Sequence, residues 1–174
     1  LLNLDRLNSE YMLQKADVLI EMRNYADAAS QLNVVYATWS DQAFDLLRLS
    51  KIQRTALDYP GAERSIKRAI ELKPKWEQAH AEYINFLVEQ SRLESAKEEL
   101  ASYQKTFGSN ANYLMLRGDL AFAQNEVEGA FSYYLKSHQA MTSFNMPLLK
   151  LYVLAQQNQQ YRNKFIKYVK EFTA

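Results

Sequence analysis

An alanine recurs every 34 residues through most of this chain of 174 residues. The four alanines, each with the large residue that follows four positions later, are Ala28 with Leu32, Ala62 with Ile66, Ala96 with Leu100 and Ala130 with Tyr134. Once the first alanine is given, three more at successive steps of 34 residues would occur by chance about one time in a thousand. A small residue at this period is typical of stacked helix-turn-helix units, because one unit cannot bury its apolar face alone and packs against the next.

The composition favours long helices joined by short turns, because only four glycines and three prolines interrupt the chain. No strand is expected. The apolar spacing within each period predicts two helices per unit. The predicted ranges are 9–22, 43–56, 77–90, 111–124 and 145–157 for the first helices, and 25–38, 60–72, 93–106, 127–141 and 160–173 for the second helices.

A second column of residues lies opposite the alanines on the first helices. Its members are Ala16, Ser50, Ile84 and Gly118, and three of these four are small. Small residues on both helices allow the two backbones to approach closely, which fixes the angle of each helix hairpin. Burial of the large residues beside them contributes about 1.5 to 3 kcal/mol each, so the stack depends on repeated packing.

These columns resemble the tetratricopeptide repeat. The pattern of that family matches best in the second unit, at Leu46, Leu49, Ser50, Ala62, Ile66, Ala69 and Pro74. The chain departs from the pattern at the bulky Ile84, and at Lys15 and Arg117, where leucine is usual. The last hairpin departs most, because Tyr152 faces Lys164 where two small residues meet in the family; we expect its helices to splay or to form a polar cap.

The resemblance implies an all-α fold, a right-handed superhelical α-solenoid of antiparallel helix hairpins. We expect one TPR-like domain over residues 1–174, with four full repeats at 9–42, 43–76, 77–110 and 111–144 and a divergent or capping hairpin at 145–174. The repeat phase places residues 1–8 at the end of a preceding helix. We therefore infer a fragment of a longer protein.

Enzymatic and metal-binding functions find little support in the residues. The two histidines, His80 and His138, fall on separate predicted helices without a metal-ligand partner at helical spacing, and there is no cysteine. No nucleophile, base and stabiliser can be assembled into one site. We expect no enzyme activity, no catalytic residue, no cofactor and no metal.

The charge pattern bears on the class of partner. The formal net charge is +1, and 21 basic and 20 acidic side chains are spread along the chain. Neither a strongly basic face nor a base-reading column is visible, so we expect no nucleic acid as partner. No apolar run has the length of a membrane span, and no direct membrane insertion is expected.

The resemblance implies a concave groove lined by the first helices, with a protein or peptide as partner. Projected onto this chain, the groove has an apolar row beside a polar row, which suits an amphipathic helix or an extended peptide. The expected groove residues are Leu13, Asp17, Ile20, Leu47, Lys51, Arg54, Asn85, Val88, Met115, Asp119, Phe122 and Val153; the same projection includes Ala81, Leu149 and Gln156.

Three functional hypotheses stay open. The first is a non-enzymatic protein-interaction scaffold, in a bacterium, that binds a segment of its partner in the groove. The second is a periplasmic structural or assembly module of a bacterial envelope system such as exopolysaccharide export. The third is end-to-end self-association into a homo-oligomer through exposed apolar termini, at Leu1, Leu2, Leu4 and Leu7 or at Phe165 and Phe172. The sequence leaves the compartment undetermined, since periplasm and cytoplasm are both compatible with it.

Overall fold

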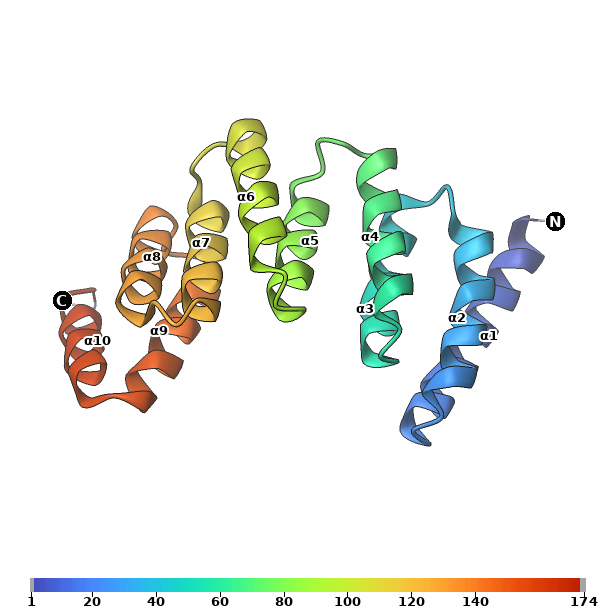
Figure 1. Cartoon of the computed structure of the whole chain (residues 1–174), viewed down its shortest axis with the longest axis horizontal. Coiled ribbons are helices and arrows are strands. Elements are labelled where there is room, and N and C mark those ends of the chain that lie inside the picture. Colours follow the sequence, from blue (N-terminus) through green and yellow to red (C-terminus); the bar gives the residue numbers. More distant parts are fainter. Residues whose placement is uncertain (1, 173–174) are drawn as a thin grey trace. The chain divides into compact units, whose positions relative to one another are not determined.

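A computed structural model describes the backbone of residues 2–172 and the side chains of residues 8–172. Within that part of the chain ten helices and no strand are present, which confirms the all-α fold class. The helices follow one another in pairs (Figure 1). They are α1 (Leu2–Glu21), α2 (Tyr25–Trp39), α3 (Ala43–Thr55), α4 (Tyr59–Leu72), α5 (Glu77–Glu89), α6 (Leu93–Phe107), α7 (Ala111–Ala123), α8 (Val127–Ala140), α9 (Asn145–Gln157) and α10 (Gln159–Phe172).

The start of α1 differs from the sequence prediction. Every other helix end lies within one residue of its predicted position, but residues 2–8 belong to the same helix as residues 9–21. The prediction that they end a preceding helix is therefore wrong. Neither glycine nor proline occurs among these residues, so no backbone signal interrupts the helix.

The structure divides into two compact units, unit one (Leu1–Tyr83) and unit two (Ile84–Ala174). The sequence predicts a single domain, and that expectation stays a prediction. Each unit has a hydrophobic core within it, and each is described by itself below.

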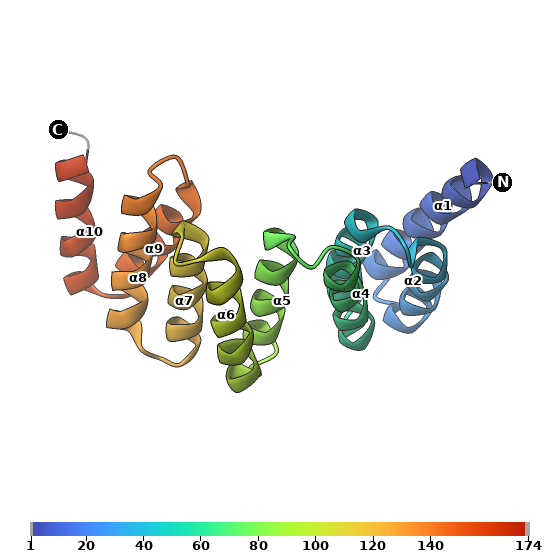
Figure 2. The same ribbon diagram turned by 90° about the horizontal axis from the view of Figure 1, so that it is seen from above.

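The core of unit one lies among α1, α2 and α3, which pack side by side (Figure 2). Ala16 and Ala28, from the two small-residue columns, are both fully buried there. The larger buried side chains of this core are Leu13, Leu32, Val35, Trp39 and Leu49. In the α3–α4 hairpin Ser50 and Ala62 are also buried, as the column pattern predicts.

The turns that close the first four hairpins share one backbone geometry. A non-glycine residue with positive φ stands at the same position of each turn, namely Arg23 (58°), Leu57 (58°), Ser91 (56°) and Asn125 (64°). In the second turn the Leu57 amide donates to the Arg54 carbonyl at 3.0 Å, and the Asp58 amide donates to the Gln53 carbonyl at 2.8 Å. This pair of bonds is the Schellman motif, which satisfies carbonyls at the end of a helix.

Unit two builds its core from α7, α8, α9 and α10. The buried members of this core are Ala121, Ala130, Phe131, Tyr134, Leu151 and Leu154. Gly118 of α7 is buried beside the Tyr134 ring, and a Cβ atom at Gly118 would lie 2.5 Å from Tyr134 Cε1. Gly118 therefore leaves space for the large Tyr134 side chain of α8, in addition to facing the alanine column.

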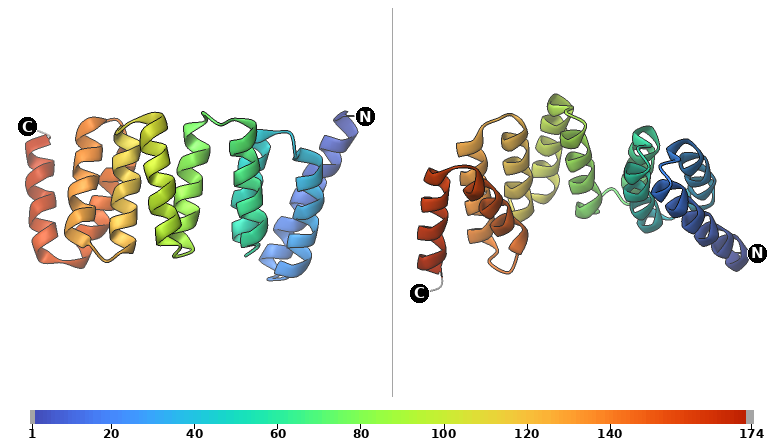
Figure 3. Two further views of the ribbon diagram at one scale, coloured as in Figure 1. Left: turned by 45° about the horizontal axis from the view of Figure 1, so that its top comes forward. Right: turned by 90° about the horizontal axis from the view of Figure 1, so that it is seen from below.

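The last hairpin, α9 with α10, differs from the others (Figure 3). Its turn has no residue with positive φ; instead Asn158 is extended, and its side chain accepts a hydrogen bond from the Gln160 amide at 2.7 Å. No described residue of α10 is buried. Lys164 Nζ forms an ion pair with Glu128 Oε1 of α8 at 2.6 Å. The capping role expected for this hairpin stays a prediction.

Candidate functional site

An apolar pocket of about 290 Å³ lies between α7 and α9 in unit two; we call it the α7–α9 pocket. Its floor consists of the buried side chains Tyr134 and Leu154. Four apolar side chains around it are largely exposed, namely Phe122 (42%), Met146 (48%), Leu149 (53%) and Val153 (48%). A cluster of exposed large apolar side chains around a hollow is typical of a surface that contacts a partner.

The sequence places these side chains together through helical spacing. Met146, Leu149 and Val153 stand three and four residues apart on α9, so they share one face of that helix. Phe122 belongs to the last turn of α7. The carboxyl-terminal end of α7 and one face of α9 thus supply the apolar lining.

Three polar groups form one edge of the pocket. Lys150 Nζ lies 2.6 Å from Asp119 Oδ1, and the Tyr134 hydroxyl donates a hydrogen bond to the same oxygen at 2.7 Å. The Lys150 ammonium also lies 5.7 Å from the centre of the Tyr134 ring. The Asp119 carboxylate is only 12% exposed, so this network holds α7, α8 and α9 together beneath the apolar rim.

Burial, and then the charge of Asp119, raises the pKa of the Tyr134 hydroxyl above its ordinary value. The phenol therefore stays neutral and keeps the proton that it donates to Asp119. This fixes the direction of the hydrogen bond, and Gly118 provides the space for the ring.

Several of the predicted groove residues in unit two lie in or near this pocket. Phe122, Val153 and Asp119 line it, and Met115 packs against the core of the unit. Asn85 and Val88 of α5 are half-buried. Asp119 differs from the expectation in one respect: its carboxylate is occupied by Tyr134 and Lys150 rather than open to a partner.

The predicted groove residues of unit one are divided between core and surface. Leu13 and Leu47 are 2% and 3% exposed, because packing within the chain covers their side chains. Ile20 is half-buried against the core, and Asp17 is exposed.

The two basic groove residues of unit one share an acidic partner on α5. Lys51 Nζ lies 2.9 Å from Glu82 Oε1, and Arg54 Nη1 lies 3.4 Å from Glu82 Oε2. The groove predicted from the sequence does not include Glu82. A carboxylate on α5, the first helix of the next repeat, is nevertheless favourable there because it pairs with both cations. Their charges are directed toward another residue of the same unit.

Besides the buried Tyr134 and Leu154, the predicted groove omits two of the more exposed pocket residues, Met146 and Lys150. Both lie outside the positions that the repeat pattern marks as groove-facing. The signal that finds Met146 is the apolar stripe on α9 itself, since Met146 precedes Leu149 by three residues and Val153 by seven. The family pattern is weakest in this last hairpin, so the helix's own spacing is the better guide there.

None of the helices described has both the length and the apolar character needed to cross a membrane. Residues 8–172 hold no group of three or more histidine, aspartate or glutamate side chains that could ligate a metal ion. The side chains of Leu1, Leu2, Leu4 and Leu7, named for self-association, lie outside the described residues, whereas Phe172 is 49% exposed and Phe165 is half-buried.

Comparison with known proteins identifies the fold. No protein-family model and no curated protein sequence matches this chain. The chain is similar to the solved structure of PilF of Pseudomonas aeruginosa, with a TM-score of 0.57 and 16% identity over 94% of this chain and 77% of that chain. It is similar to MamA of Desulfovibrio magneticus RS-1, with a TM-score of 0.57 and 12% identity over 94% of each chain.

A third similar structure is that of PilW, a type IV pilus biogenesis factor. Its TM-score is 0.59, and the identity is 17% over 93% of this chain and 78% of that chain. Identities this low concern the fold alone. The chain therefore has the tetratricopeptide-like all-helical fold of these bacterial proteins.

Proposed function

We propose that this chain is a non-enzymatic protein-interaction module that binds an apolar segment of a partner protein in the α7–α9 pocket. The observation that carries the proposal is the exposed cluster of Phe122, Met146, Leu149 and Val153 around that pocket. The tetratricopeptide-like fold, which PilF, MamA and PilW share, supports a role in contacts between proteins.

An amphipathic helix is the occupant that this pocket fits best. Its apolar side chains, spaced three or four residues apart, would enter the pocket beside Phe122 and Leu149. The Lys150 side chain is 32% exposed, so its ammonium group can form an ion pair with an acidic residue at the edge of the bound helix. Burial of two apolar anchors contributes about 1.5 to 3 kcal/mol each before the cost of ordering the peptide.

Selection of displayed amphipathic peptides against the whole chain, followed by calorimetry, tests this proposal. We expect a selected peptide to bind the double variant Phe122→Ala, Leu149→Ala at least about tenfold more weakly than the parent, because about 1.4 kcal/mol already corresponds to that factor. Ile166→Ala is the matched control, since Ile166 is 45% exposed and lies on α10, outside the pocket. Equal affinity of the parent and the double variant would contradict the proposal.

A second candidate function is an assembly module of a bacterial envelope system. The observation that favours it is the fold shared with PilW, a type IV pilus biogenesis factor. Exopolysaccharide export is one such system. Fractionation of cells that express the natural gene product with an epitope tag tests this candidate: recovery with periplasmic or membrane material supports it, and recovery with cytoplasmic proteins contradicts it.

A further inference from the structure

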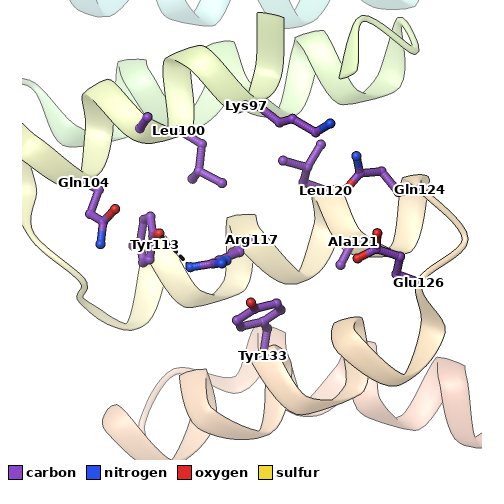
Figure 4. Close-up of a pocket in the computed structure, with 11 residues that line it drawn as sticks. Lys97, Leu100, Gln104, Tyr113, Arg117, Leu120, Ala121, Gln124, Glu126 and Tyr133 are labelled. Atoms are coloured by element: carbon purple, nitrogen blue, oxygen red, sulfur yellow. Dashed lines mark hydrogen bonds between the residues drawn. The ribbon is translucent and has the colours of Figure 1, made fainter. Parts of the chain in front are cut away.

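A second pocket of unit two, of about 390 Å³, lies between α6 and α7; we call it the α6–α7 pocket (Figure 4). Its apolar base consists of Leu100, Leu120 and Ala121, all of them buried. The remaining lining is polar and aromatic, and it includes Tyr113 and Arg117 of α7 and Tyr133 of α8. This composition differs from the apolar lining of the α7–α9 pocket.

The pocket exists at a departure from the repeat pattern. Arg117 stands where the tetratricopeptide pattern has leucine. A leucine there would add to the apolar packing between neighbouring helices, whereas the longer arginine places a charged guanidinium group in the pocket wall (Figure 4). Arginine at position 117 therefore reduces the apolar packing between the helices and provides a polar group in the pocket.

The guanidinium group of Arg117 is held in place from two sides. Its carbon lies 4.8 Å from the centre of the Tyr133 ring, a favourable cation–π distance. Its Nη1 donates a hydrogen bond to the Tyr113 hydroxyl at 3.2 Å. A guanidinium group has five N–H donors in a planar fork, so further donors remain for a ligand while its orientation is restrained.

Tyr113 adds a second donor at the same point. Its side chain is buried, with 5% exposed, and its hydroxyl oxygen accepts the bond from Arg117. The hydroxyl proton is then available to donate to a ligand oxygen. The Arg117 guanidinium and the Tyr113 hydroxyl thus present two kinds of donor side by side, which suits the two oxygens of one carboxylate.

Both basic and acidic side chains lie around the pocket. Lys97 on α6 lines the pocket and forms an ion pair with Glu94 at 2.7 Å. The Lys136 ammonium lies 5.9 Å from the centre of the Tyr133 ring. Glu126, an acidic lining residue, follows the carboxyl-terminal end of α7, whereas Tyr113 lies in its first turn. Glu126 therefore lies at the opposite end of α7 from Tyr113, and Arg117 stands between them along the helix (Figure 4).

We propose that the α6–α7 pocket binds a carboxylate of a partner protein through the Arg117 guanidinium and the Tyr113 hydroxyl. This site is separate from the α7–α9 pocket and does not depend on it. The guanidinium group and the neighbouring hydroxyl can each donate to one oxygen of a planar carboxylate.

Small model compounds test the proposal on the whole chain. N-acetylglutamate α-amide presents a side-chain carboxylate and N-acetylalanine presents a terminal one, and each is titrated into nitrogen-15-labelled protein while the Arg117 Nε–H and the α7 amides are followed by NMR. We expect saturable shifts with at least one of the two compounds. The one that binds more tightly identifies the source of the carboxylate.

Two variants and one control make the test specific. Arg117→Gln should weaken binding at least about tenfold and Tyr113→Phe about fivefold, as expected for the loss of a charged and a neutral hydrogen bond. Arg162→Gln is the control, because Arg162 is exposed on α10 and does not line the pocket. Tyr113→Phe keeps the ring, so it remains informative if Arg117→Gln perturbs the fold.

Three results would overturn the proposal. The first is the absence of saturable shifts with both carboxylates. The second is equal binding of the neutral analogue N-acetylglutamine α-amide, or of inorganic phosphate, to the same residues. The third is unchanged affinity in both variants.

Discussion

At the scale of single residues, Gly118 and Tyr134 show how one column of the repeat serves the candidate site. The absence of a Cβ atom at Gly118 lets the Tyr134 ring lie against α7, and the Tyr134 hydroxyl then reaches Asp119. The sequence predicts a small residue at Gly118 and a large one at Tyr134. It does not predict their contact, because that depends on how deeply the ring enters between the helices.

Replacement of Gly118 by alanine should destabilise the protein. The added Cβ would lie 2.5 Å from a buried ring, and overpacking of this kind costs about 1 to 3 kcal/mol. The better helix propensity of alanine offsets roughly 1 kcal/mol of that cost, so we expect a net loss of up to about 2 kcal/mol in urea unfolding.

Gly129→Ala is the matched control for this prediction. Gly129 lies within α8, and a Cβ atom there would meet its nearest neighbour at 3.8 Å, an ordinary contact. That variant should be neutral or more stable. Equal destabilisation of both variants would show that the space beside Tyr134 is not what requires glycine at position 118.

Tyr134 should also make the protein less stable in alkali. Its pKa is raised above the model-compound value of 10.0, so the folded protein keeps this proton at a pH where the unfolded chain has lost it. The contribution is fully present below about pH 10 and decreases as the pH rises further, by about 1.4 kcal/mol per pH unit.

Tyr134→Phe tests that dependence. The variant should lose about 1 to 2 kcal/mol at neutral pH, because the Asp119 carboxylate loses a buried donor. Above pH 10 its free energy of unfolding should fall less steeply than that of the parent. The raised pKa values of Tyr83, Tyr161 and Tyr168 act in both proteins and cancel in the comparison. Parallel curves would contradict the assignment to Tyr134.

At the scale of elements, the sequence predicts the helices well because the 34-residue period locates every turn. The exception is the start of α1, because residues 2–8, which lie before the first predicted unit, belong to the same helix. The period predicts only part of the candidate site. It includes Phe122 and Val153, which line the α7–α9 pocket, but also Leu13 and Leu47, which neighbouring side chains cover.

The hairpin turns carry a strain that the sequence does not reveal. Leu57 adopts φ of 58°, a region that costs a residue with a Cβ atom about 1 kcal/mol or more. Its side chain is 51% exposed, so little packing depends on it. Glycine is the preferred residue at this position of a Schellman motif.

Leu57→Gly should therefore stabilise unit one by about 0.5 to 1 kcal/mol. Urea unfolding of the variant measures the gain, which should appear as a higher midpoint with an unchanged slope. Leu57→Ala removes the same side chain but keeps the Cβ atom, so it should show no gain. A gain of the same size in the alanine variant would attribute the effect to the exposed leucine rather than to the backbone.

At the scale of the whole molecule, each of the two units has its own core and its own surface features. The sequence predicts one solenoid domain from a single period, and that prediction remains open. A period describes the residues that each helix pair repeats. It does not describe features that one pair alone possesses, and both pockets of unit two arise from such features, the stripe on α9 and the arginine at position 117.

The central claim is that a partner binds at the α7–α9 pocket, and the methionine methyl groups report on it directly. The chain has five methionines; Met146 lines the pocket and is 48% exposed, whereas Met22, on unit one, is 71% exposed. In protein labelled with carbon-13 at the methionine methyls, a peptide selected for binding should shift the Met146 signal and leave the Met22 signal in place. An unchanged Met146 signal at saturating peptide would contradict the claim.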